Sequence, residues 1–106
     1  MDPRAERVGR NEALFREVNE RILEVSDGAE MEILCECGDA ECTVSFLITH
    51  GEYEGVRADP TRFAVAHGHV AEGIEQVIVE NDRFAVVEKI GDATRIATET
   101  DPRKAS

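Results

Sequence analysis

Three cysteines lie within eight residues of this chain, Cys35, Cys37 and Cys42, and the chain has no other cysteine. Two histidines, His67 and His69, follow about twenty-five residues later on either side of a glycine. Thiolate sulfur and imidazole nitrogen are ligands that zinc takes in proteins, and four of them complete its tetrahedral coordination. These residue types and their spacing predict a site of three cysteines and one histidine that binds one zinc per chain.

The spacing of the cysteines is C-x-C-x4-C, which is less common in zinc sites than paired C-x2-C. Along a strand, Cys35 and Cys37 point the same way, and a turn at Gly38 brings Cys42 back beside them. Two other interpretations stay open, in which the cysteines are redox-active thiols or small apolar core residues. Two glutamates among the cysteines are expected to face solvent, Glu36 and Glu41.

The residues alone leave the fourth ligand open. His67 and His69 lie on one face if the preceding strand continues through Gly68, and on different faces if Gly68 turns the chain. His50 or a water molecule is a further alternative.

The composition bounds the class of protein. A chain of 106 residues with 42% apolar residues is expected to form a single domain over residues 1–106, with a small core that a metal would help to stabilise. The formal net charge is −11, from 23 acidic and 12 basic residues. That charge disfavours nucleic acid, because proteins usually neutralise its phosphates with lysine and arginine.

No feature of the sequence indicates a membrane protein. Apolar runs are too short to cross a bilayer, and the first twenty residues are charged and lack the apolar stretch of a signal peptide. We therefore expect a cytoplasmic protein whose cysteines stay reduced. The odd number of cysteines also prevents complete disulfide pairing within one chain.

Residues 4–25 are predicted to form an amphipathic helix. One stripe repeats at alternating steps of three and four and should face the core. It consists of Val8, Asn11, Phe15, Val18, Ile22 and Val25. Charged residues are predicted to cover the opposite face: Arg10, Glu12, Arg16, Glu17, Glu20, Arg21 and Glu24. The stripe resembles a coiled-coil seam, so a helix-mediated dimer is the alternative to docking within one chain, which we favour.

The remaining pattern predicts an α+β fold. Five segments have the composition of strands, residues 30–36, 43–49, 63–66, 76–80 and 84–90. We expect them to form one small antiparallel β-sheet packed on the N-terminal amphipathic helix, with zinc joining the first turn to the loop at His69. This zinc-clamped sheet spans about residues 30–90, and residues 99–106 are expected to form a loose tail.

A short helix is predicted between the second and third strands. Thr49 can cap it, because Glu52 three residues later completes a capping-box pattern. Tyr53 should face inward from this helix, and Pro60 ends it.

Nearly the whole chain resembles a family of short, uncharacterised actinobacterial proteins. The resemblance includes Cys35-Glu36-Cys37-Gly38 with Cys42, Pro60-Thr61-Arg62-Phe63 and Gly68-His69. The family pattern has a histidine after this glycine and none before it. The resemblance therefore implies that the fourth ligand is His69 rather than His67, and it implies no particular activity.

These observations favour a non-enzymatic intracellular protein, in which zinc stabilises an interaction or regulatory module that binds another protein. A site with four protein ligands has no open position for a substrate. The alternative is a thiol-based redox sensor, in which oxidation of Cys35 or Cys37 expels zinc. A zinc hydrolase, with a water on the metal and a glutamate as base, ranks third.

Overall fold

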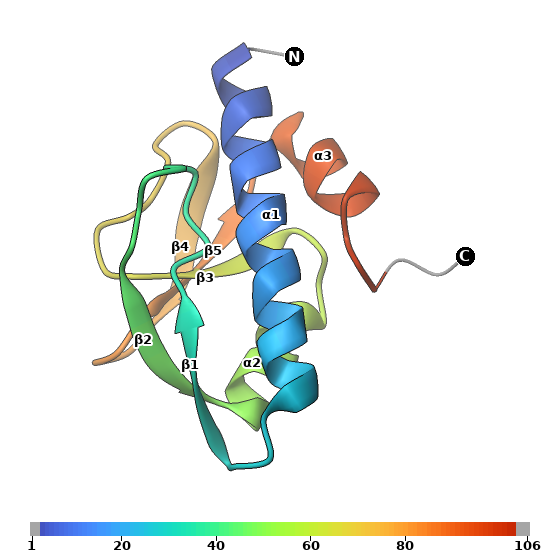
Figure 1. The fold of residues 1–106 in the computed structure, drawn as a ribbon. Coiled ribbons are helices and arrows are strands. Elements are labelled where there is room, and N and C mark those ends of the chain that lie inside the picture. The colour runs from blue at the N-terminus through green and yellow to red at the C-terminus, as the bar shows by residue number, and fades with distance from the viewer. Residues whose placement is uncertain (1–2, 104–106) are drawn as a thin grey trace.

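The computed structural model describes residues 3–103, and these form the predicted α+β fold (Figure 1). In chain order the elements are α1 (Pro3–Val25), β1 (Glu30–Leu34), β2 (Ser45–Thr49), α2 (His50–Arg57), β3 (Arg62–Val65), β4 (Glu75–Glu80), β5 (Ala85–Lys89) and α3 (Ala93–Glu99). Figure 1 shows α1 crossing the molecule, with the strands on one side and α3 on the other. Within the described residues, the helices are all too short or too polar to traverse a bilayer.

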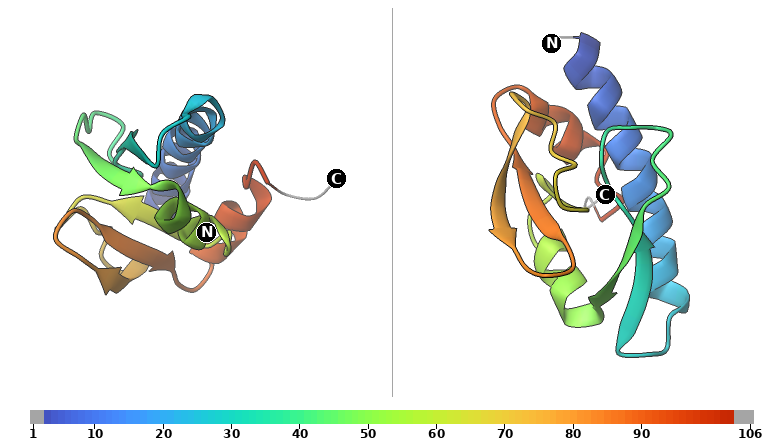
Figure 2. Two further views of the ribbon diagram at one scale, coloured as in Figure 1. Left: turned by 90° about the horizontal axis from the view of Figure 1, so that it is seen from below. Right: turned by 90° about the vertical axis from the view of Figure 1, so that its left-hand side faces the viewer.

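The strands form two antiparallel sheets, so the prediction of one sheet is wrong. β1 pairs with β2, while β3, β5 and β4 lie side by side in that order (Figure 2). The split occurs directly after β1. The amide of Cys35 still donates to the carbonyl of Val44 at 2.9 Å, as in the first hairpin, but the amide of Glu36 donates to the carbonyl of Ala64 in β3 at 2.8 Å. The chain thus leaves one sheet and bridges to the other.

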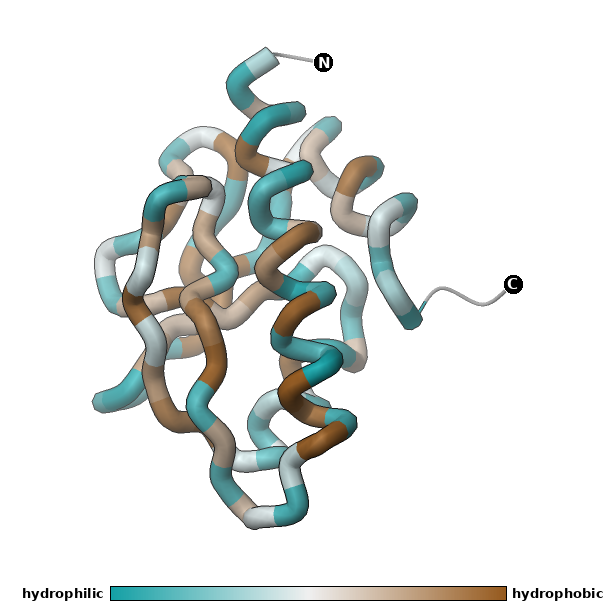
Figure 3. Tube along the Cα trace, viewed as in Figure 1, coloured by the Kyte–Doolittle hydropathy of each residue, from teal (hydrophilic) through white to brown (hydrophobic). Residues whose placement is uncertain are grey.

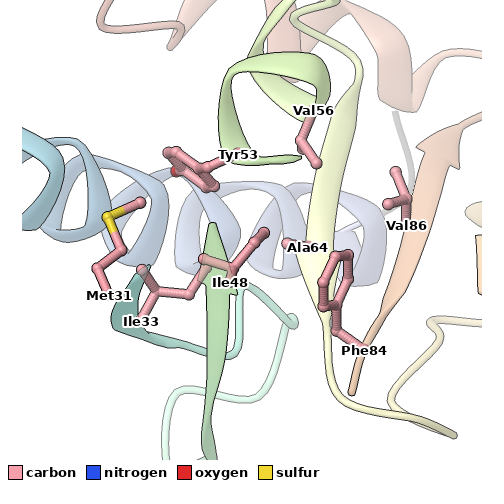
Figure 4. Packing of buried hydrophobic residues seen from close by; sticks show 8 residues of the cluster. All are labelled: Met31, Ile33, Ile48, Tyr53, Val56, Ala64, Phe84 and Val86. Carbon is pink, nitrogen blue, oxygen red and sulfur yellow. The ribbon is translucent and has the colours of Figure 1, made fainter. Parts of the chain in front are cut away.

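β3 and β5 are covered on both faces, which explains their unbroken apolar runs, whereas β4 at the edge of the sheet is mostly exposed. One face belongs to a core formed with β1, β2 and α2: Met31, Ile33, Ile48, Tyr53, Val56, Ala64, Phe84 and Val86 (Figure 4). The alternate residues of β3 and β5 enter a second cluster: Cys35, Cys37, Phe63, Val65, Ala85, Val87 and Ala97. Two of the three cysteines are therefore part of the packed interior.

The docking face of α1 differs from the predicted one. Its buried residues are Ala5, Gly9, Glu12, Arg16, Asn19 and Glu20. Most of them follow the predicted spacing but come one residue later, which rotates the buried face by about 100°. Val25 at the end of the predicted stripe is 82% exposed. Figure 3 shows how hydrophilic and apolar residues alternate along this helix.

Specific polar partners explain this rotation. Arg16 Nη1 donates to the carbonyl of Pro60 at 2.7 Å, and its Nη2 donates to that of Ala97 at 2.8 Å. Asn19 bonds both backbone groups of Leu34, with Nδ2 donating to the carbonyl at 2.8 Å and Oδ1 accepting from the amide at 2.9 Å. These partners satisfy the two Nη atoms of Arg16 and the side-chain amide of Asn19, so the helix can dock through residues that the pattern places in solvent.

The last described residues are held against α1 and α2, in contrast to the predicted loose tail. Asp101 pairs with Arg57, whose side chain is 0% exposed, and Arg103 pairs with Glu20. The rest of the predicted tail, residues 104–106, lies outside the described residues.

The capping box at α2 is confirmed. The amide of Glu52 donates to Thr49 Oγ1 at 3.0 Å, and the amide of Thr49 donates to Glu52 Oε1 at 2.8 Å. Arg83 Nη2 also reaches Glu52 Oε2 at 2.6 Å. The Arg83 guanidinium, followed by the Thr49 amide, lowers the pKa of Glu52 to about 2.

Candidate metal centre

The three cysteines and His69 lie together. One ligand atom from each, the three Sγ atoms and a ring nitrogen, are all within 4.8 Å of one another. His69 Nδ1 is 3.6 Å from Cys35 Sγ and 3.6 Å from Cys42 Sγ. Zinc–sulfur bonds of about 2.3 Å and zinc–nitrogen bonds of about 2.0 Å place nitrogen and sulfur about 3.5 Å apart in a tetrahedral site, close to the two distances found here. The donor set therefore fits a tetrahedral metal ion.

The cysteine segment, residues 35–42, turns sharply between Cys37 and Cys42. Asp39 shapes the turn, because its carbonyl accepts from the amide of Cys42 at 3.1 Å and its Oδ1 accepts from the amide of Glu41 at 2.9 Å. The amide of Asp39 in turn donates to the thiol of Cys37. This closed turn brings the sulfur of Cys42 back to the sulfurs of Cys35 and Cys37, which follow β1.

A turn after β3 supplies the histidine. The amide of His69 donates to the carbonyl of Ala66 at 3.1 Å, and Gly68 has a φ of 81° at the third position, where a type II turn favours glycine. Because Gly68 turns the chain, the two histidines separate. His67 is exposed with its Nε2 against the carbonyl of Asn81, while His69 reaches the sulfurs.

The third histidine is engaged elsewhere. His50 begins α2, and its Nε2 lies 3.0 Å from Ser26 Oγ. Of the candidate fourth ligands in the sequence, the structure thus brings only His69 to the cysteines.

The cysteine sulfurs are largely shielded from water. Cys35 and Cys37 are buried, and Cys42 is half-buried. Burial is the largest cause that raises the pKa of the Cys35 and Cys37 thiols. The amide of Ala66 opposes this at Cys35, since it donates to Sγ at 3.2 Å. A bound divalent cation favours the thiolate strongly, so metal binding would ionise sulfurs that burial alone keeps protonated.

Glu36 is completely buried, and the expectation that it faces solvent is wrong. Its Oε2 accepts from Asn19 Nδ2 at 3.0 Å and from the Tyr53 hydroxyl at 2.6 Å, while its Oε1 accepts from the amide of Ala64 at 2.9 Å. Burial raises the pKa of Glu36, and these hydrogen bonds oppose the rise. Strand alternation groups Glu36 with exposed glutamates of β1, so the sequence gives no signal of this role.

The amino-terminal helix holds the cysteine segment through Gly38. Asn11 Nδ2 donates to the carbonyl of Gly38 at 2.8 Å. A Cβ at position 38 would lie 2.4 Å from Cγ1 of Val8, so only glycine allows this close approach. Asn11, which the pattern places on the core stripe, thus bonds the segment that carries the cysteines.

Comparison with known proteins found no matching family model, curated protein or solved structure. The resemblance to the actinobacterial family therefore stays a prediction, and we infer the function from the site itself.

We predict that Gly38→Ala destabilises the protein by about 1–3 kcal/mol, because the added methyl group pushes the stiff Val8 side chain and with it α1. Gly51→Ala is the matched control. Gly51 lies in α2 with no atom within 4 Å of an added Cβ, so this change should stabilise by about 0.5–1 kcal/mol. Urea unfolding measures the change in unfolding free energy of both variants. If both were destabilised, or both stabilised, the packing described here would be contradicted.

Glu36→Ala should cost on the order of 3 kcal/mol of unfolding free energy, because it removes the acceptor of three buried hydrogen bonds. Glu41→Ala changes the same residue type in the same segment, but Glu41 is exposed, so its effect should stay within about 0.5 kcal/mol. Thermal or urea denaturation compares the pair. A tolerated change at position 36 would show that the buried carboxylate does not organise this region.

Proposed function

We propose that Cys35, Cys37, Cys42 and His69 bind one zinc ion per chain, and that zinc stabilises a non-enzymatic interaction or regulatory module. The observation that carries the proposal is the position of His69 Nδ1. It lies 3.6 Å from the sulfurs of Cys35 and Cys42, which precede His69 by 34 and 27 positions in the sequence. Three sulfurs and an imidazole suit zinc, which takes such tetrahedral sets in structural sites. Zinc bound there would close long loops and so contribute folding free energy to a small domain.

The number of donors supports a structural rather than a catalytic metal. Catalytic zinc keeps a position for water or substrate, whereas four protein ligands fill the tetrahedron. The proposed role of the chain is therefore to present a stable surface to another protein. A hydrolase would need one of these four donors to be displaced.

Exposed apolar residues support a protein as the partner. β4 lies at the edge of its sheet, and its Val77, Ile78 and Val79 are exposed. The net charge of −11 disfavours nucleic acid. We further propose a monomer, because α1 docks within its own chain, and a cytoplasmic location, where three thiols stay reduced for the metal.

A redox sensor is the second candidate. Cys42 is the most exposed of the three cysteines and lies close to the other two sulfurs, so an oxidant could reach it first. Mild peroxide followed by a thiol reductant separates the candidates, because a sensor releases and recovers zinc reversibly while a structural site resists.

Protein purified without added metal should contain about one zinc per chain by elemental analysis. Cys37→Ser should lose most of that zinc and melt at a clearly lower temperature, since the metal contributes to folding. Treating the unmodified protein with a chelator should lower its melting temperature in the same way. Iron with visible absorbance would identify another metal, and a metal-free protein of unchanged stability would refute the structural role.

The two neighbouring histidines provide an internal comparison. His69→Ala should weaken zinc binding far more than His67→Ala, because only the His69 ring lies against the sulfurs. Competition with a chromogenic chelator measures both affinities on folded protein. A larger effect at position 67 would reverse the assignment of the fourth ligand.

A further inference from the structure

Three charged groups meet in the interior away from the cysteines. They are Glu12 on α1, Glu75 at the start of β4 and Lys89 at the end of β5, and their side chains are 0%, 0% and 1% exposed. Lys89 Nζ pairs with Glu12 Oε1 and lies 2.9 Å from Glu75 Oε1. Two carboxyl groups therefore compete for one ammonium group in a site without water contact.

The surroundings do not neutralise the second carboxyl group. Glu75 Oε2 accepts from the amide of Ala71 at 3.0 Å, but Glu12 Oε2 has no hydrogen-bond partner in the part of the chain that the structure describes. The next cation on the buried face of α1 is Arg16, which donates to backbone carbonyls instead. From β3 the aromatic ring of Phe63 faces this region, 5.6 Å from Lys89 Nζ.

The turns of α1 that precede Glu12 meet apolar groups of α3. Gly9 lies against Ile96, and Ala5 packs with Ala93. The charged groups that act on Glu12 are Glu75 and Lys89. A second unpaired negative charge in such a site is costly, and a proton shared between neighbouring carboxyl groups removes it.

We propose that Glu12 and Glu75 share one bound proton at neutral pH, and that loss of this proton to solvent at alkaline pH loosens the packing of α1 on the sheet. The helix thus acts as a pH-sensitive latch, which is held closed while the proton is bound. Glu75 and Lys89 are direct cross-strand partners in the β4–β5 ladder, so they stay in place. Glu12 is carried by a helix, which can move away from the sheet. When both carboxyl groups are ionised, their repulsion acts on α1.

The cysteine segment would respond to this movement. Asn11 precedes Glu12 and donates to the carbonyl of Gly38, and Val8 one turn earlier touches Gly38. A shift of this half of α1 therefore loosens the contact that holds the turn before Cys42. The latch needs no metal to operate, so it can be tested separately from zinc binding.

The direction of the pH effect follows from linkage. Burial, and after it the neighbouring Glu75, raises the pKa of Glu12 well above its ordinary value. Through this group the folded protein binds more protons than the unfolded chain, so the contribution of Glu12 to stability is full at low pH and is lost as pH rises through its folded pKa. Glu52 behaves in the opposite way. Its pKa is lowered to about 2, so its contribution to stability is lost only as pH falls in the acid range.

Carbon-13 NMR of the full chain as purified, labelled at glutamate carboxyl groups, tests the bound proton. We expect a carboxyl signal that titrates well above the ordinary glutamate value of about 4.3 and that disappears in Glu12→Gln. Glu75→Gln provides a second variant if the first does not fold. The absence of any raised carboxyl titration that Glu12→Gln removes would overturn the proposal.

Urea unfolding and amide hydrogen exchange test the latch itself. Between about pH 5.5 and the folded pKa, each pH unit should shift the unfolding equilibrium of the unmodified protein by up to about tenfold. Glu12→Gln should reduce this dependence to the part that Glu36 contributes, because burial raises the pKa of that carboxyl group as well, whereas Glu52→Gln should retain it in full. Amides of α1 should lose protection at alkaline pH only when Glu12 is present, after correction for intrinsic exchange. Equal protection in Glu12→Gln and the unmodified protein would refute the latch.

Discussion

A carboxyl group buried between two cysteines is the constraint on which the rest of this structure depends. Glu36 has no exposed surface, and such a group is stable only when donors surround it. Its donors come from three elements, Asn19 of α1, Tyr53 of α2 and Ala64 of β3. The hydrogen bonds of this one side chain therefore fix where α1, α2 and the larger sheet lie relative to the cysteines.

Directional bonds of this kind also explain why α1 docks through a polar face. Asn19 bonds the backbone of Leu34 and the carboxyl group of Glu36, which leaves the helix little freedom to rotate or slide. That placement brings Val8 and Asn11 onto Gly38. The donor atoms of the candidate metal centre are thus brought together by contacts that involve no metal.

Local patterns predicted most of the elements and the three clustered cysteines. The span of α1, the capping box at Thr49 and the clustered cysteines depend on residues close in sequence. The resemblance was needed to prefer His69, and the turn at Gly68 gives the geometric reason. The phase of α1 and the burial of Glu36 could not be predicted, because they depend on distant partners such as Leu34 and Ala64. The split sheet has the same origin, since Glu36 leaves one ladder for another.

The position of Tyr53 gives the protein its own optical reporter. The chain has one tyrosine and no tryptophan, so a single side chain of known environment dominates its intrinsic emission. That ring lies in the main core, and its hydroxyl bonds the carboxyl group that lies between two cysteines. Loss of this bond changes the surroundings of the one fluorophore. Disruption of the cysteine segment can therefore be followed in real time without an attached dye.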